Sequence, residues 1–204
     1  MSKYTTLEQH ASYGIGLQMG QQLADNPFDG LDIDAVAAGV IAAFTEQAPE
    51  VSDEQIRAAF TVISERMQAE QAEKAQLLAE AGEAFLAENA KRPEITVTAS
   101  GLQYEVLVAA EGEKPTRNST VRTHYHGTLI DGTVFDSSYQ RGEPAEFPVS
   151  GVIAGWTEAL QLMSPGSKLR LYIPHNLAYG ERGAGNAIAP FSALIFDVEL
   201  LAIL

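Results

Sequence analysis

The second half of the chain takes its fold from one stretch, Thr120-Val-Arg-Thr-His-Tyr-His-Gly-Thr-Leu-Ile-Asp-Gly-Thr-Val-Phe-Asp-Ser-Ser138. Residues 120–127 alternate as the residues of a half-buried β-strand do, and Asp131-Gly132 is typical of a tight hairpin turn. The same two-residue period appears at 101–108, 168–173 and 193–201, and one short helix fits 155–163. The sequence therefore predicts an α+β unit of roughly 110 residues, an antiparallel sheet wrapped on one short helix.

The first half of the chain has the helical period instead. Apolar residues predict helices at about 6–24 and 32–46. A third helix starts at the capping-box pattern Ser52-Asp-Glu-Gln55 and continues to about Asn89 without proline, with Gly82 as its only glycine. At about 1.5 Å per residue, this helix would be about 55 Å long.

The third helix has an uneven apolar pattern. A stripe of Ile56, Phe60, Ile63 and Met67 is predicted to pack on the first two helices, whereas residues 68–76 hold no large apolar side chain. Apolar side chains then resume at Leu77, Leu78, Ala81, Phe85 and Leu86. A helix segment that is polar all round usually bridges domains through solvent. The pattern predicts a stalk helix whose first part, residues 56–67, is packed on the first two helices. Its last part, residues 77–86, contacts another segment of the protein.

Two short helices and the base of a third bury too little surface to be stable alone, which predicts a two-fold homodimer. Gly14, Gly16 and Gly20 on the first helix each cost up to about 1 kcal/mol of helix propensity. Close approach between helices would compensate for this cost, and the alternative is that these glycines merely fray the helix. Their spacing is not GxGxxG and no strand precedes them, so a nucleotide loop is excluded.

Composition excludes several functional classes. The 204 residues carry a net charge of −14, which argues against nucleic acids and anionic lipid surfaces as partners. The absence of cysteine excludes disulfides, thiolate nucleophiles and zinc–cysteine sites. No run of about 18 apolar residues and no signal-like N-terminus is present, so we expect a cytoplasmic protein, or a periplasmic one if a signal peptide was removed.

Several motifs in the second half together resemble the FKBP-type peptidyl-prolyl isomerases. They are Tyr125-His-Gly127, Asp131-Gly132, Val134-Phe-Asp-Ser-Ser138, Val152-Ile-Ala-Gly-Trp156, Ala178-Tyr-Gly180 and Leu194-Ile-Phe-Asp-Val-Glu-Leu-Leu201. The helical first half is similar to that of the bacterial Mip-like subgroup, whose members are V-shaped homodimers. The resemblance implies a helical dimerisation domain at 1–50, a stalk helix at 51–92 and an isomerase domain at 93–204.

The resemblance also implies roles for individual residues. Its catalytic set is Tyr125, Phe135, Asp136, Trp156, Tyr179 and Phe196, and its substrate-binding set is Arg141, Phe147, Val152, Ile153 and Ile188. Trp156 would form the floor under the prolyl ring. The Tyr179 hydroxyl and the Ile153 N–H would donate to substrate carbonyls, and Asp136 would be held by Arg141 and Tyr125. Ile188 would lie on the loop that caps the site.

Two positions depart from many small eukaryotic members of the family. Ala145 replaces a second aromatic residue and Ala184 replaces a frequent histidine, so affinity for macrolides such as rapamycin, the implied inhibitors, is put in doubt. Simpler readings are that Trp156 is a core residue and that Asp136 forms a surface ion pair. His124 and His126 share a strand face but have no evident third ligand, so neither a metal nor a cofactor is expected.

These observations favour an enzyme that isomerises X–Pro bonds in unfolded or partly folded proteins and so accelerates folding. An apolar pocket disfavours the planar, dipolar amide more than the twisted one, and the reaction moves no proton. The alternative is a dimeric chaperone clamp or scaffold in which isomerisation is secondary. A third hypothesis is a dimerisation module with an inactive pocket.

Overall fold

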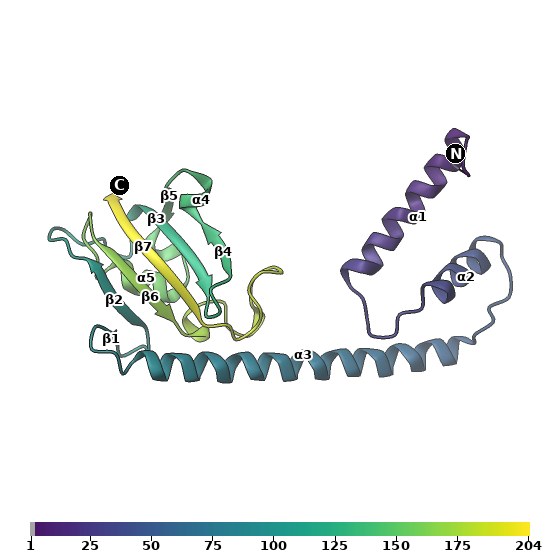
Figure 1. The fold of residues 1–204 in the computed structure, drawn as a ribbon, viewed down its shortest axis with the longest axis horizontal. Helices are drawn as coiled ribbons and strands as arrows, with labels where there is room; N and C mark the ends of the chain where they lie inside the picture. The colour runs from purple at the N-terminus through teal and green to yellow at the C-terminus, as the bar shows by residue number, and fades with distance from the viewer. Residues whose placement is uncertain (1–2) are drawn as a thin grey trace. The chain divides into compact units, whose positions relative to one another are not determined.

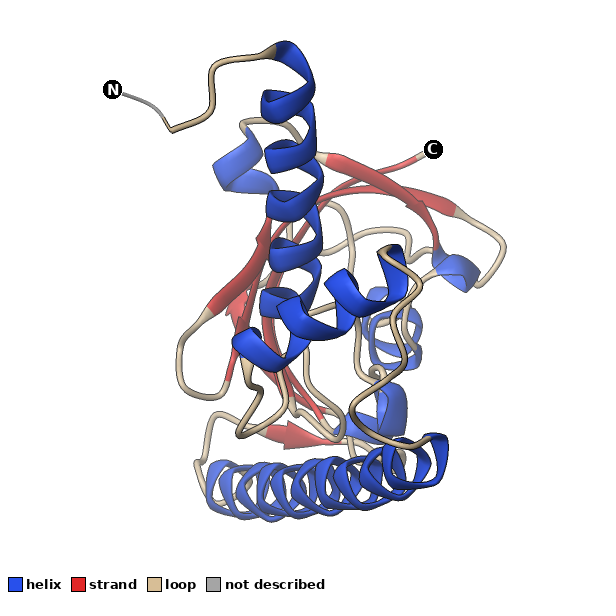
Figure 2. Cartoon of the chain, turned by 90° about the vertical axis from the view of Figure 1, so that its right-hand side faces the viewer, coloured by secondary structure: helices blue, strands red, loops and turns tan. Residues whose placement is uncertain are grey.

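The computed structural model describes residues 3–204, which form two compact units divided at residues 70 and 71. The first unit consists of helices and loops, and the strands belong to the second (Figures 1 and 2). Within residues 3–204, each helix is too short or too polar to cross a lipid bilayer. The α+β class and the helical first half predicted from the sequence are both confirmed.

Three helices open the chain, as predicted: α1 (Leu7–Asp25), α2 (Ile33–Phe44) and α3 (Asp53–Asn89). The predicted capping box is present at the start of α3. The Ser52 N–H donates to Gln55 Oε1 over 3.1 Å, and the Gln55 N–H donates to Ser52 Oγ over 3.3 Å. These side chains satisfy two of the backbone groups that a helix start leaves unpaired, which fixes where α3 begins.

The helices of the first unit leave their large apolar side chains uncovered in the single chain. Neither α1 nor α2 has a buried residue. Phe44 on α2 is 88% exposed and Phe60 on α3 is 66% exposed. Ile63 and Met67 are half-buried. In one copy of the chain, the stripe from Ile56 to Met67 is therefore only partly covered.

Seven antiparallel strands form one sheet in the second unit. They are β1 (Thr96–Val97), β2 (Gln103–Val108), β3 (Thr120–Leu129), β4 (Val134–Ser137), β5 (Ala145–Pro148), β6 (Lys168–Ile173) and β7 (Leu194–Ile203). Their order is β1-β2-β6-β7-β3-β4, and β5 pairs with β3. The long central strands β3 and β7 run side by side (Figure 1) and place Gly127 opposite Phe196.

Short helical segments complete this unit. They are α4 (Ser138–Arg141), α5 (Ala154–Leu160) and the 3₁₀ turns Val149–Gly151, His175–Leu177 and Gly180–Arg182. The predicted Asp-Gly turn is confirmed, since Gly132 has a φ of 87° and its N–H donates to the Leu129 carbonyl. The short strands β1 and β5 and helix α4 were not predicted as elements.

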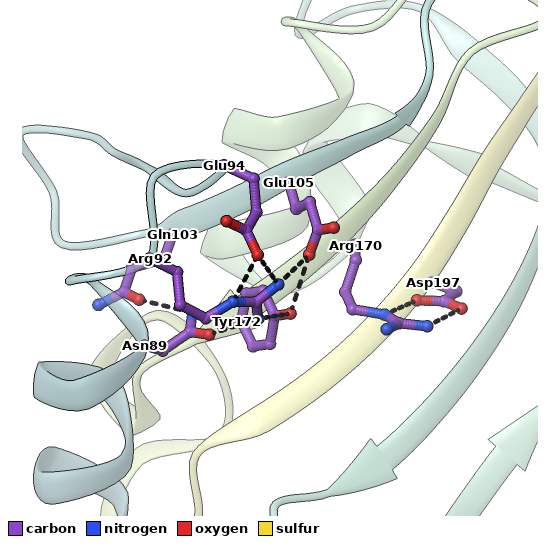
Figure 3. A network of polar contacts seen from close by, with 8 residues as sticks. All are labelled: Asn89, Arg92, Glu94, Gln103, Glu105, Arg170, Tyr172 and Asp197. Atoms are coloured by element: carbon purple, nitrogen blue, oxygen red, sulfur yellow. Dashed lines mark hydrogen bonds and ion pairs between the residues drawn. The ribbon is translucent and has the colours of Figure 1, made fainter.

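The core lies between α5 and the sheet. Trp156 and Leu160 on α5 are buried, and so are Val121, Leu171 and Val198 on three different strands. Alternation along the strands explains this arrangement, because every second side chain faces α5. The polar side chains Arg170 and Asp197 occupy intervening strand positions and form a bidentate ion pair, with the Arg170 Nε 2.6 Å from Asp197 Oδ1 (Figure 3).

The C-terminal end of α3 is part of the second unit. The Asn89 amide donates to Gln103 Oε1 over 2.9 Å, and Arg92 donates both to Glu105 and to the Tyr172 hydroxyl, each over 2.9 Å (Figure 3). The positions of α3 that are buried or half-buried here are Ala75, Leu78, Ala79, Gly82, Phe85, Leu86 and Asn89. They recur every three or four residues and so form one helix face.

This face corrects the apolar stripe predicted for the end of α3. Leu78, Phe85 and Leu86 are covered as expected, but Leu77 is 60% exposed and Ala81 is also exposed. The buried positions are instead Gly82 and Asn89. Gly82 allows a close approach of the backbone, and the side-chain amide of Asn89 donates a hydrogen bond to Gln103. The predicted contact near the far end of the helix is confirmed.

Candidate functional site

A cavity of about 460 Å³ opens between α5, strands of the sheet and two loops. Its walls are mostly apolar or aromatic, and Asp136 is the one charged residue among them. The lining residues are Tyr125, Phe135, Asp136, Phe147, Gly151, Val152, Ile153, Trp156, Tyr179, Ala184, Ala187, Ile188 and Phe196. Cavities of this size and character bind small ligands or single side chains in proteins.

Trp156 lies at the centre of an aromatic cluster. Its indole meets the rings of Tyr125, Phe147 and Phe196 edge-on, with centroids 5.3, 5.8 and 5.2 Å apart. Edge-to-face contacts of this kind hold rings in fixed orientations. Trp156 is only 4% exposed and still lines the cavity, so it is a core residue and a wall of the site at once.

Gly127 on β3 makes room for two of the aromatic walls. A methyl group added to Gly127 would lie 2.7 Å from both Phe135 Cζ and Phe196 Cε1. The two phenyl rings themselves pack edge-to-face with centroids 5.3 Å apart. The glycine after His126 therefore has a steric reason, since any side chain would displace the rings from the cavity wall.

A triad of polar groups lies at the edge of the cavity. The Tyr125 hydroxyl donates to Asp136 Oδ2 over 2.6 Å and accepts from Arg141 Nη2 over 2.7 Å. Arg141 also pairs with the other carboxylate oxygen of Asp136, and its guanidinium carbon lies 5.4 Å from the Tyr125 ring centroid. Both carboxylate oxygens are thus engaged, which fixes the orientation of Asp136.

These contacts settle the protonation of the triad. Burial acts to raise the pKa of Asp136, but the hydrogen bonds from Tyr125 and Arg141 and the positive charge of Arg141 outweigh it, so the pKa lies below its ordinary value. Burial and the hydrogen bond to Asp136 raise the pKa of Tyr125. At neutral pH, Asp136 is therefore ionised and the Tyr125 hydroxyl keeps its proton.

Three donors on cavity-lining residues have no acceptor among residues 3–204. They are the backbone N–H of Ile153 at the start of α5, the hydroxyl of Tyr179 and the buried indole N–H of Trp156. Ala184 and Ile188, which also line the cavity, are joined by two backbone hydrogen bonds of 2.8 and 3.1 Å. The cavity therefore offers free donors along an apolar wall.

The structure brings all the predicted site residues to one place. Ten of them line the cavity, and Arg141 contacts it through Asp136 and Tyr125. Sequence reasoning did not assign Gly151, Ala184 and Ala187 to the site. Small residues in loops carry no chemical signal of their own, and Ala184 was noted only as a departure from a family pattern.

The two alternating histidines lie outside this cavity and have other contacts. His124 Nδ1 is 2.9 Å from the Ser138 hydroxyl, and the His124 ring stacks on Tyr139 with centroids 4.6 Å apart. His126 faces a separate hollow beside Arg170 and Tyr172. Among residues 3–204, no group of three or more His, Cys, Asp or Glu side chains is placed to hold a metal ion.

The chain was compared with protein-family models and with known proteins. The family model for FKBP-type peptidyl-prolyl cis-trans isomerases matches residues 111–201, and the model for the domain amino-terminal to it matches residues 8–106. The FKBP-type 22 kDa peptidyl-prolyl cis-trans isomerase of Escherichia coli is 53% identical over 201 residues, which is 98% of each chain. The chain belongs to the FKBP-type peptidyl-prolyl cis-trans isomerases. The resemblance read from the sequence is thus confirmed, and so is the enzyme class.

Two further relatives cover both halves of this FKBP-type isomerase. The outer membrane protein MIP of Legionella longbeachae is 39% identical, over 98% of this chain and 87% of its own. The crystal structure of FkpA from Escherichia coli superposes with a TM-score of 0.72 at 36% identity and covers 98% of both chains. The similarity therefore extends through the N-terminal helices and is not confined to the isomerase domain.

The protonation states at the cavity predict the pH profile of this isomerase. We expect kcat/KM for a short X–Pro peptide to stay constant between about pH 5 and pH 9, because the pKa of Asp136 is lowered from its ordinary value and that of Tyr125 is raised. Since the pKa of Asp136 is depressed, activity should fall only as the pH drops below its ordinary value of 3.8. Stopped-flow assays across this range check the prediction, and a step near neutral pH would contradict it.

Proposed function

We propose that this isomerase twists X–Pro bonds in the cavity over Trp156. The observation that carries the proposal is an apolar aromatic cavity of about 460 Å³ with one oriented carboxylate at its edge. Trp156 would lie under the pyrrolidine ring, and Tyr125, Phe135 and Phe196 would surround it. Proteins with X–Pro bonds in exposed or unfolded segments are the proposed substrates.

The proposed mechanism uses binding and electrostatics alone. A planar amide carries charge separation through resonance, and the barrier to its rotation is about 18–20 kcal/mol. An apolar cavity stabilises this dipole less than water does, whereas the twisted amide loses little on entering it. The Ile153 N–H and the Tyr179 hydroxyl would donate to the neighbouring substrate carbonyls, and Asp136 would supply a fixed negative charge near the rotating bond.

The chain would also act as a homodimer that binds unfolded proteins. The basis is the apolar surface left uncovered on α1, α2 and the first half of α3, where Leu7, Phe44 and Phe60 are all more than half exposed. Soluble monomers rarely expose so many large apolar side chains within one helical unit. A second copy offers the same apolar side chains, so a two-fold interface would cover both sets.

The glycines of α1 fit this proposal. A methyl group added at Gly14, Gly16 or Gly20 would meet nothing within 4 Å in the single chain. Their cost in helix propensity, up to about 1 kcal/mol each, is therefore not offset within one copy. Close approach of a helix from the second copy would offset it.

One substitution tests the dimer in the full chain. Phe60→Glu places a charge in the proposed interface, and Gln68→Glu adds the same charge at an exposed polar position of the same helix. In sedimentation velocity we expect the wild type and Gln68→Glu to be dimers and Phe60→Glu to be a monomer, because an unpaired carboxylate is costly to bury. A monomeric wild type would contradict the proposal.

The same variants test the binding of unfolded chains. Two pockets on one dimer raise the apparent affinity for a long client, so Phe60→Glu should slow catalysed refolding of a proline-limited protein about tenfold. Its kcat/KM for a short peptide should stay unchanged, since the cavity lies within one chain. Equal rates of catalysed refolding with Phe60→Glu and Gln68→Glu would contradict the hypothesis of a dimeric clamp. A loss of peptide isomerisation in Phe60→Glu would mean that the pocket depends on the dimer.

Macrolides such as rapamycin are proposed inhibitors, because the aromatic cavity suits a large apolar ligand with carbonyl groups. Ala184 lines the cavity, where it leaves the rim more open than a histidine side chain would, whereas Ala145 is half-buried against the core and does not line the cavity. Competition with a short X–Pro peptide measures this binding.

A cytoplasmic location stays a prediction from the sequence.

A further inference from the structure

Helix α3 lies directly against the segment that carries one wall of the cavity. Gly82, on the buried face of the helix, packs on Ala193, the residue immediately before β7. A methyl group added at Gly82 would lie 3.2 Å from Ala193 Cβ and 4.0 Å from the Phe191 carbonyl oxygen. The lack of a side chain at Gly82 therefore sets how closely the helix approaches residues 191–193.

Phe191 ties that contact to the other end of the loop. Its φ is +60°, a strained value for a residue with a large side chain. Its N–H donates to the Gly180 carbonyl over 2.9 Å, and its ring packs against His175 with centroids 5.1 Å apart. Since Gly180 directly follows Tyr179, a shift of Phe191 would displace both ends of the loop between residues 180 and 191.

The residues between these two anchor points form the cavity rim. Ala184, Ala187 and Ile188 line the cavity, and Ile188 is buried. Paired backbone hydrogen bonds between Ala184 and Ile188 join the two ends of this loop. The position of this rim thus depends on residues 180 and 191, and through residue 191 on the helix.

We propose that α3 positions the rim of the prolyl cavity and that Gly82 is the positioning residue. The proposal rests on the assignment of the cavity as the X–Pro site. Gly82 touches no substrate and acts through Ala193 and Phe191. The helix that belongs to the N-terminal half of the sequence would therefore set how well the isomerase pocket fits its substrate.

Gly82→Ala tests this contact with a single methyl group. Ala193 Cβ is attached directly to the backbone and cannot rotate away, so the backbone at residues 191–193 must move by a few tenths of an ångström. The variant should still fold, because alanine favours a helix over glycine. Ala193→Gly removes the opposing methyl group, and the double variant restores the lost space.

The experiment compares full-length wild type, Gly82→Ala, Ala193→Gly and the double variant, with Ala84→Leu as control because Ala84 is exposed two residues away on the same helix. We expect Gly82→Ala to lower kcat/KM for a short X–Pro peptide about threefold, mainly through KM, because small displacements of binding groups weaken catalysis. The double variant should recover the wild-type value, and Ala84→Leu should keep it.

Amide hydrogen exchange without substrate tests the contact separately from the chemistry. The Ala184 and Ile188 amides should exchange faster in Gly82→Ala and return to wild-type rates in the double variant. Unchanged kinetics in Gly82→Ala, equal loss in Ala84→Leu, or no recovery in the double variant would each overturn the proposal. If Trp156 variants also kept full activity, the assignment of the cavity itself would be at fault, and loop exchange would still report on the contact.

Discussion

Replacing Trp156 with alanine is expected to lower kcat/KM for a short X–Pro peptide about a hundredfold, because the substrate ring loses the surface that positions it. The indole contacts Tyr125, Phe147 and Phe196 edge-on, so its removal also frees the walls of the cavity. Truncation of a buried tryptophan costs about 3–5 kcal/mol of unfolding free energy. Stopped-flow isomerisation and urea unfolding measure the two losses.

Trp156→Phe separates catalysis from stability. It keeps an aromatic ring on α5 and loses less volume, so we expect a smaller loss of stability and about a tenfold loss of kcat/KM. Activity should then follow the size of the ring at residue 156 while both variants remain folded. A folded Trp156→Ala protein with wild-type kcat/KM would show that the substrate binds elsewhere.

Replacing Asp136 with alanine is the second large expected effect. The change removes the only carboxylate at the cavity and leaves the Tyr125 hydroxyl and Arg141 without their shared acceptor. We expect a loss of about 2 kcal/mol of transition-state stabilisation, which is roughly thirtyfold in kcat/KM. Asp136→Asn keeps an acceptor for Tyr125 without the charge, so it should lie between the alanine variant and the wild type.

The Arg170–Asp197 pair provides a matched control. It is a second Asp–Arg pair in the same unit, with bonds of 2.6 and 2.9 Å, and neither residue lines the cavity. Asp197→Ala therefore breaks the same kind of contact and should leave kcat/KM unchanged. Equal losses in Asp136→Ala and Asp197→Ala would mean that Asp136 acts through the fold and not at the substrate.

The sequence predicted the parts of this molecule that have strong local signals. Strand alternation located β2, β3, β6 and β7, and the Ser52–Gln55 capping box located the start of α3 to within a residue. The site residues came together as predicted because the family motifs carry their spacing. Their individual roles stay predictions until the substitutions above are made.

Features set by packing between distant segments were not readable from the sequence. Leu77 and Leu78 are both good core residues, and only the contact with the sheet decides that Leu78 is covered and Leu77 is exposed. From the sequence, Gly82 is only a residue of low helix propensity within α3. Its close contact with Ala193 explains why a glycine is present there. The short strand β5 depends on its pairing with β3 and has too few residues to show a period.

The fluorescence of Trp156 during titration with an X–Pro peptide tests the central claim most directly. Trp156 is the only tryptophan in the chain, so its selectively excited emission reports on this one cavity. The account predicts that the emission changes on binding and saturates at the peptide concentrations that saturate isomerisation. The same emission change is expected for Asp136→Asn, a variant that should still bind the peptide. Unchanged emission while the enzyme is saturated with peptide would contradict it.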